Sequence, residues 1–170
     1  MRSQDFHYFA EPSLVEFSGD GSDVGQKDEL NSADELRKGK DVVRILVVED
    51  HEMARKAICD LVRREEAFEV VCEAANGLEG IEAAQKLKPD IVILDITMPT
   101  MGGIEAAAHI HRVARKARIV FLSQHNSDKV AQAALATGAH AYVLKSSAGK
   151  DLIRAIRAAV AGQRFRSKLA

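Results

Sequence analysis

The sequence predicts an α/β protein in which helices cover both faces of a parallel β-sheet. From Val42 onward, short apolar stretches alternate with longer stretches of helical period, and this alternation occurs five times. Strands that alternate with helices predict βαβ units, whose strands run parallel. The apolar stretches consist mostly of Val, Ile and Leu, as expected for strands that are buried on both faces.

Five strands are expected at 43–48, 69–73, 91–94, 118–122 and 140–144, where the chain reads VRILVV, EVVCE, IVIL, RIVFL and HAYVL. Each has four to six residues, which is an ordinary strand length and too short for a buried helix. Asn76-Gly77 is a turn signal and separates the second strand from the helix that follows it.

Five helices are expected at about 52–65, 78–87, 103–114, 127–136 and 149–161. Pro89 ends the second helix, and Gly138 stands where a left-handed cap would close the fourth. Gly162 follows the fifth. Right-handed crossovers between five such units favour a flavodoxin-like (βα)5 three-layer sandwich with the parallel strand order 2-1-3-4-5.

Composition divides the 170 residues into three parts. Residues 1–41 show no sustained period and carry ten acidic and five basic residues, so we expect a disordered acidic N-terminal extension. Residues 42–162 form the predicted folded domain. Residues 163–170 carry three basic residues, and we expect them to be a short basic C-terminal tail that frays.

Charge and hydropathy exclude several classes of function. No stretch of about 18 apolar residues is present, and the first residues lack the apolar region of a secretory signal, so we expect a cytoplasmic protein without membrane contact. Residues 42–170 carry fifteen acidic and nineteen basic residues, an excess too weak to predict direct binding of nucleic acid. Cys59 and Cys72 lack the spacing of a metal site and are expected to be small buried apolar residues.

Polar side chains stand at the carboxyl ends of four predicted strands. Glu49 and Asp50 follow the first strand, and Asp95 follows the third. Ser123 follows the fourth strand, and Lys145 follows the fifth. Because parallel strands end at the same edge of their sheet, we expect these side chains to converge where open α/β sheets bind ligands.

This combination suits the transfer of a phosphoryl group to a carboxylate. Asp95 is the candidate nucleophile and would form an acyl phosphate. Glu49 and Asp50 are candidate ligands of Mg²⁺, which prefers oxygen atoms and takes few carboxylates. Lys145 would offer a fixed positive charge to the phosphoryl oxygens, and the hydroxyl of Ser123 would donate a hydrogen bond to them.

Four stretches of the chain carry a resemblance to a known family. They are Ile45–His51, Asp95–Gly103, Leu122-Ser123 and Gly138–Lys145, of which the second is the most specific. Over residues 42–162 the sequence resembles the receiver domain of bacterial response regulators, the phosphorylated half of two-component signalling.

The resemblance implies a mechanism. A histidine kinase or a phosphotransfer protein would donate its phosphoryl group to Asp95, and Mg²⁺ would be held by Asp50 and Asp95 with help from Glu49. Ser123 and Tyr142 would act as a coupled switch, in which the aromatic ring turns inward when the hydroxyl moves to the phosphoryl group.

Three further positions are expected to tune the pocket. By resemblance, Thr97 and His125 line its mouth and set the rate of dephosphorylation. Gln124 stands where receivers often have a small residue, so it bears on access to the phosphoryl group.

The string Leu144-Lys145-Ser146-Ser147 resembles the NarL/FixJ subgroup, which usually continues into a DNA-binding helix-turn-helix. Eight residues follow Gly162, too few for such a domain. We therefore expect output through an unknown downstream protein, and the resemblance also allows a weak homodimer through the first and fifth helices.

Alternative functions remain. The chain could be the receiver part of a LuxR-type DNA-binding transcriptional regulator whose output domain is absent from this chain, or a phosphate relay or sink. A haloacid-dehalogenase-like phosphatase also uses a strand-end aspartate, but it needs a second aspartate where this chain has Thr97. The favoured prediction is a signalling protein that is not an enzyme.

Overall fold

The computed structural model describes residues 42–169, so the predictions for residues 1–41 lie outside the described part. Its strands are β1 (Val43–Val48), β2 (Phe68–Ala74), β3 (Ile91–Asp95), β4 (Arg118–Ser123), β5 (Ala141–Leu144) and β6 (Phe165–Arg166). Its helices are α2 (Glu52–Arg63), α3 (Gly77–Leu87), α4 (Gly103–Val113), α5 (Asp128–Ala136), the short 3₁₀ helix η2 (Lys145–Ser147) and α6 (Ala148–Val160). None of these helices is long and apolar enough to cross a membrane.

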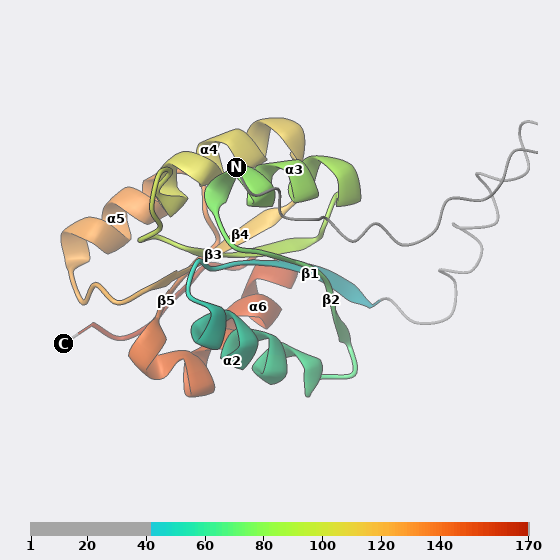
Figure 1. The fold of residues 1–170 in the computed structure, drawn as a ribbon. Helices are drawn as coiled ribbons and strands as arrows, with labels where there is room; N and C mark the ends of the chain where they lie inside the picture. The colour runs from blue at the N-terminus through green and yellow to red at the C-terminus, as the bar shows by residue number, and fades with distance from the viewer. Residues whose placement is uncertain (1–41, 170) are drawn as a thin grey trace, which may run out of the picture. The chain divides into compact units, whose positions relative to one another are not determined.

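All strands are parallel, in the order β2-β1-β3-β4-β5-β6. Helices α3, α4 and α5 cover one face of the sheet, and α2 and α6 cover the other (Figure 1). The predicted α/β class, the three layers and the order of the first five strands are confirmed, and the predicted element bounds agree within two residues.

The alternation of side chains along each strand produces two apolar cores. Ile45 and Val47 of β1 point to the α2 and α6 face, whereas Leu46 and Val48 point to the other face. All four are at most 1% exposed. After their first one or two residues the central strands are therefore mostly apolar, and the polar groups of interest stand at their last position or directly after it.

Capping residues determine where the helices begin and end. The Nδ1 atom of His51 accepts the backbone N–H of Ala54 and starts α2, so this histidine lies beside the acidic pair as a cap. The Oδ1 atom of Asn76 accepts the N–H of Glu79 and starts α3. Gly138, with a φ of 92°, follows the end of α5 as predicted.

The expectation of a frayed C-terminal tail is wrong for residues 165–167. Phe165 donates its backbone N–H to His140 O (3.0 Å), and Ser167 donates its own to Tyr142 O (2.9 Å). These bonds satisfy carbonyl groups on the otherwise open edge of β5, which explains why so short a segment becomes a sixth strand. Two residues are too few to show a strand period in the sequence.

Candidate functional site

Asp95 is the last residue of β3, and it is only 2% exposed. The loop 96–102 leads back toward the end of β3, where α4 begins: Gly103 donates its N–H to Ile96 O at 2.9 Å. A Cβ atom at Gly103 would lie 1.9 Å from the carbonyl oxygen of Asp95. Glycine is therefore required where α4 packs against the backbone of Asp95.

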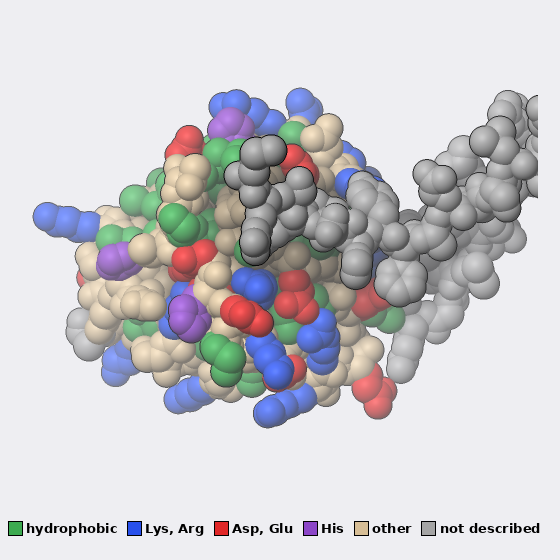
Figure 2. Space-filling model, viewed as in Figure 1, with side chains coloured by type: hydrophobic (Ala, Val, Ile, Leu, Met, Phe, Trp, Pro, Cys, Tyr) green, Lys and Arg blue, Asp and Glu red, His purple; other side chains and the backbone are tan. Residues whose placement is uncertain are grey.

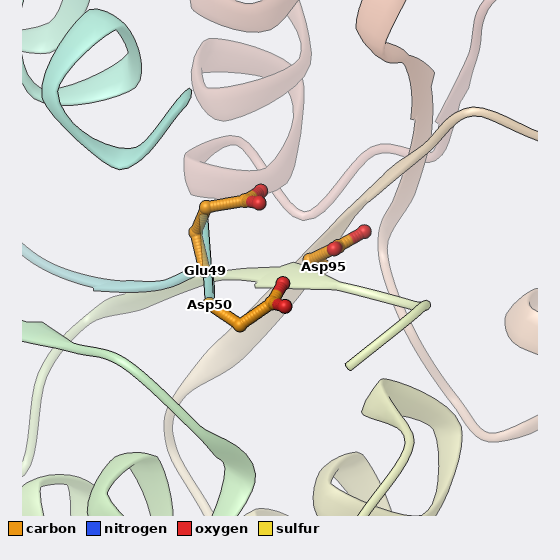
Figure 3. A group of neighbouring side chains, drawn as sticks. All are labelled: Glu49, Asp50 and Asp95. Carbon is orange, nitrogen blue, oxygen red and sulfur yellow. The ribbon is translucent and has the colours of Figure 1, made fainter. Parts of the chain in front are cut away.

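The two predicted acidic groups meet. Glu49, Asp50 and Asp95 each contribute a carboxylate oxygen, and these oxygens lie within 4.8 Å of one another. Figure 3 shows the side chains of the two residues that follow β1 converging on that of Asp95. Glu49 is buried, whereas Asp50 is exposed, so the group is open to solvent on one side.

Lys145 completes the group, as predicted. Its Nζ atom lies 2.7 Å from Glu49 Oε2 and 3.0 Å from Asp95 Oδ2. Burial by itself would lower the pKa of Lys145, but the hydrogen bonds to Glu49 and Asp95 outweigh it and raise the pKa. The ammonium group is therefore a permanent positive charge beside the candidate nucleophile.

The carboxyl group of Glu49 is buried between Lys145 and Asp95, and this surrounding shifts its pKa. Burial is the main cause that raises its pKa, and the nearby charge of Asp95 adds to the effect, although the hydrogen bond from Lys145 opposes it. Its Oε2 atom is close to Lys145 Nζ, yet it accepts no well-oriented hydrogen bond within residues 42–169. Such an oxygen atom can accept a hydrogen bond from a water molecule that is bound to a hard cation such as Mg²⁺.

A hollow of about 550 Å³ opens above these groups, lined by Glu49, Asp50, His51, Met53, Ala54, Asp95, Thr97, Gln124 and Lys145. Acidic and basic side chains gather at the centre of the face drawn in Figure 2. Thr97 and Gln124 line this hollow, whereas His125, which was expected at its mouth together with Thr97, does not line it and contacts Thr97 instead. Another hollow of about 560 Å³, among 88–90 and 112–117, contains none of the predicted site residues, so chemistry rather than volume identifies the site.

Ser123 and Tyr142 are both fully buried, and the backbone of His125, whose side chain is exposed, bonds to each of them. The backbone N–H of His125 donates to Ser123 Oγ (3.0 Å), and the hydroxyl of Tyr142 donates to His125 O (2.6 Å). The ring of Tyr142 thus points inward, the orientation that the resemblance assigns to the switched state. The two predicted switch residues are linked through one residue of the loop after β4.

Arg55 supports the site and has no signal in the sequence beyond a basic residue in the first turn after the acidic pair. Its NH1 atom donates to the backbone oxygen of Glu49 at 2.8 Å. This bond ties α2 to the end of β1 and so fixes the backbone that carries two of the three carboxylates.

Comparison with known proteins agrees with this geometry. Residues 45–157 match the response regulator receiver domain family. The chain belongs to that family. The receiver domain is a part of response regulators, and the matched residues lie within the predicted 42–162.

Two curated response regulators are similar to this chain over about 120 residues. The nitrate/nitrite response regulator protein NarL of Escherichia coli K12 is 38% identical over 119 residues, which cover 70% of this chain and 55% of NarL. The response regulator protein VraR of Staphylococcus epidermidis is 35% identical over 121 residues, 71% of this chain and 58% of VraR. The chain thus spans little more than half the length of the curated relatives it matches.

A solved structure has the same fold. The two-component response regulator of the LuxR family from Aurantimonas sp. SI85-9A1 superposes with a TM-score of 0.70 at 39% identity, over 73% of this chain and 89% of that one. The predicted NarL-like character of the receiver is supported by both kinds of comparison.

Proposed function

We propose that this receiver domain accepts a phosphoryl group on Asp95 from a histidine kinase or a phosphotransfer protein and passes the signal on by changing its surface. The observation that carries the proposal is the position of Lys145 Nζ, 3.0 Å from Asp95 Oδ2 inside a group of three carboxylates. Asp95 is a buried carboxylate at a strand end, and the ammonium group of Lys145 beside it can stabilise the negative charge of a phosphoryl group that is transferred to Asp95.

The chemistry needs little from the protein beyond position. An Oδ atom of Asp95 attacks the phosphorus atom, a new O–P bond forms, and the P–N bond to the donor histidine breaks with its electron pair left on nitrogen. Lys145 neutralises the phosphoryl oxygens as they come within reach of its Nζ atom. Gln124 and Thr97 at the mouth limit the access of water to the product.

Glu49, Asp50 and Asp95 would hold Mg²⁺, and their three carboxylate oxygens, which lie within 4.8 Å of one another, fit that assignment. When bound, Mg²⁺ neutralises charge on the carboxylates and on the phosphoryl group, which otherwise repel each other. The protein is then a signalling protein of the cytoplasm whose only chemistry occurs on its own Asp95, rather than an enzyme that acts on other substrates.

The output is proposed to be a protein contact. Ser123 and Tyr142 both bond to the backbone of His125. When the hydroxyl group of Ser123 moves toward the phosphoryl group, the loop between β4 and α5 therefore changes its conformation. The segment 124–150 would present the changed surface to a downstream protein. A weak homodimer through α2 and α6 is a further proposal that rests on the resemblance to the NarL group.

One observation favours a second candidate function. Because the chain spans 55% of NarL and 58% of VraR, the same receiver could serve as the regulatory part of a longer DNA-binding regulator of the LuxR type. In that case the surface of 124–150 would contact an output domain instead of a separate protein.

The proposal is tested by incubating the full chain with a small phosphodonor and Mg²⁺ and measuring its intact mass. The wild type is expected to gain one phosphoryl group, and Asp95→Asn is expected to gain none. Asp60→Asn, an exposed aspartate of α2, serves as the control and should be labelled like the wild type. Full labelling of Asp95→Asn would show that the acceptor is another residue.

A further inference from the structure

The sixth strand extends the edge of the strand that leads to Lys145. Backbone bonds from β6 reach β5 as far as Tyr142, and there the strand pairing stops. The next backbone donor along this edge of β5 is the N–H of Leu144. The hydroxyl oxygen of Ser167 accepts it at 3.3 Å and so takes the place of a backbone carbonyl group.

The same hydroxyl group bonds to the helix that follows β5. Ser167 donates to Asp151 Oδ2 at 2.7 Å, a short bond that is strengthened by the negative charge of its acceptor. Asp151 lies in the first turn of α6, where the helix dipole favours a carboxylate. Ser167 is 1% exposed and Asp151 is 8% exposed, so water competes only weakly for the bond between them.

These two bonds bracket the turn that carries Lys145. Leu144 directly precedes Lys145, and Asp151 lies just beyond the start of α6, so one hydroxyl group fixes the chain on both sides of η2. We propose that Ser167 is a positioning residue for Lys145: through Leu144 and Asp151 it holds the ammonium group between Glu49 and Asp95. This inference rests on the proposed role of Asp95.

The rest of β6 is anchored without the hydroxyl group. Arg166 NH1 lies 2.9 Å from Asp128 Oδ1 on α5, and the guanidinium group of Arg154 lies 5.5 Å from the centre of the Phe165 ring. Ser167→Ala therefore removes the bonds to Leu144 and Asp151 but leaves the strand in place. Because β6 stays anchored when the hydroxyl group is removed, the effect of Ser167 on Lys145 can be measured separately from its effect on stability.

The experiment uses the full chain and four variants: Ser167→Ala, Ser167→Thr, Asp151→Asn and Lys168→Ala. Beryllofluoride, a phosphoryl mimic, is titrated with excess Mg²⁺ at a temperature at which every variant is folded, and thermal unfolding is measured separately. Ser167→Thr keeps the hydroxyl group. Lys168→Ala is the matched control, because Lys168 is exposed in the same segment.

Ser167→Ala is expected to bind beryllofluoride about five-fold more weakly than the wild type, the size of effect of one net hydrogen bond. Asp151→Asn should show a smaller loss, Ser167→Thr should recover most of the affinity, and Lys168→Ala should match the wild type. A folded Ser167→Ala with wild-type affinity overturns the proposal, even if its melting temperature is lower. If Ser167→Ala does not fold, Asp151→Ala, which removes the acceptor of the Ser167 hydroxyl group, is titrated in its place, and wild-type affinity of this variant overturns the proposal.

Failure of the proposed function would look different. In that case the wild type itself would bind no beryllofluoride at Asp95 and would gain no phosphoryl mass. A wild type that binds the mimic, together with a Ser167→Ala variant that binds it equally well, would leave Asp95 as the acceptor and reject only the role of Ser167.

Discussion

The Nε2 atom of His125 lies 3.1 Å from the Oγ1 atom of Thr97, and this contact joins the loop after β4 to the loop after β3. The backbone of His125 also accepts the hydroxyl of Tyr142 and donates to Ser123. One residue thus contacts three predicted site residues. His125 therefore links the loop after Asp95 to the buried pair Ser123 and Tyr142.

Loss of the contact between His125 and Thr97 is expected to shorten the life of the acyl phosphate. His125→Ala and Thr97→Val each remove it, and water then reaches the phosphoryl group more easily. We expect dephosphorylation to become about three- to ten-fold faster, the effect of one net hydrogen bond. The decay of the phosphorylated mass after removal of the donor measures the rate, with Lys129→Ala on the surface of α5 as the control. Unchanged decay in both variants would reject the contact as a barrier to water.

Mg²⁺ binding is expected to depend on Asp50, the exposed member of the acidic group. Asp50→Asn removes one of three carboxylates, so the affinity should fall at least about ten-fold. Chemical shifts followed by NMR during titration with MgCl₂ give the affinity, and Asp60→Asn should behave like the wild type. Equal affinity of Asp50→Asn would place the cation elsewhere.

Gly103→Ala is expected to destabilise the fold strongly. Its Cβ atom would meet the carbonyl oxygen of Asp95 at 1.9 Å, and backbone cannot yield as a side chain can. The free energy of unfolding should fall by about 3 kcal/mol or more. Gly149→Ala in α6 is the matched control, since nothing lies within 4 Å of its added Cβ, and its stability should stay equal or rise by up to about 1 kcal/mol. Urea unfolding compares the two, and similar losses for both would contradict the packing argument.

Stability is expected to fall as the pH drops below 6.5, because two histidines have no partner for an added proton. Burial lowers the pKa of His111, and burial together with the charges of Arg118, His111 and Arg164 lowers the pKa of His140. The atoms His111 Nε2 and His140 Nδ1 are buried and accept no hydrogen bond within residues 42–169. The unfolded chain therefore binds more protons between the ordinary pKa of 6.5 and the lowered values, so acid favours unfolding there.

Urea unfolding at a series of pH values from about 8 to 5 tests this expectation. His140→Gln should flatten the dependence of stability on pH, whereas His109→Gln on α4 should leave it as in the wild type. A slope that His140→Gln does not change would mean that other groups cause the acid sensitivity.

Occupation of Asp95 is expected to alter hydrogen exchange in two segments. Beryllofluoride should change protection in 96–103, which follows the acceptor, and in 123–150, which contains Ser123 and Tyr142. The connection through His125 is the physical reason. If exchange in 123–150 stays the same while Asp95 is fully occupied, the domain is better explained as a phosphate relay or sink.

Local patterns were sufficient to predict the sheet and the main groups of the site. The strands of Val, Ile and Leu lead into Glu49-Asp50, Asp95 and Lys145. Because the carboxyl ends of parallel strands lie at one edge of the sheet, these polar side chains were expected to lie close together. The stop at Gly138 was also predictable, since its cause lies in its own backbone conformation, with a φ of 92°.

Tertiary structure alone decided the contacts that support and connect these groups. Thr97 and His125 are 28 residues apart, and Leu144 and Ser167 are 23 apart, so no periodic pattern relates them. The strand β6 has two residues, which is shorter than any detectable strand period. It forms because β5 leaves an edge with unpaired backbone groups and Asp151 offers a buried acceptor, and both conditions exist only after the sheet and α6 have packed.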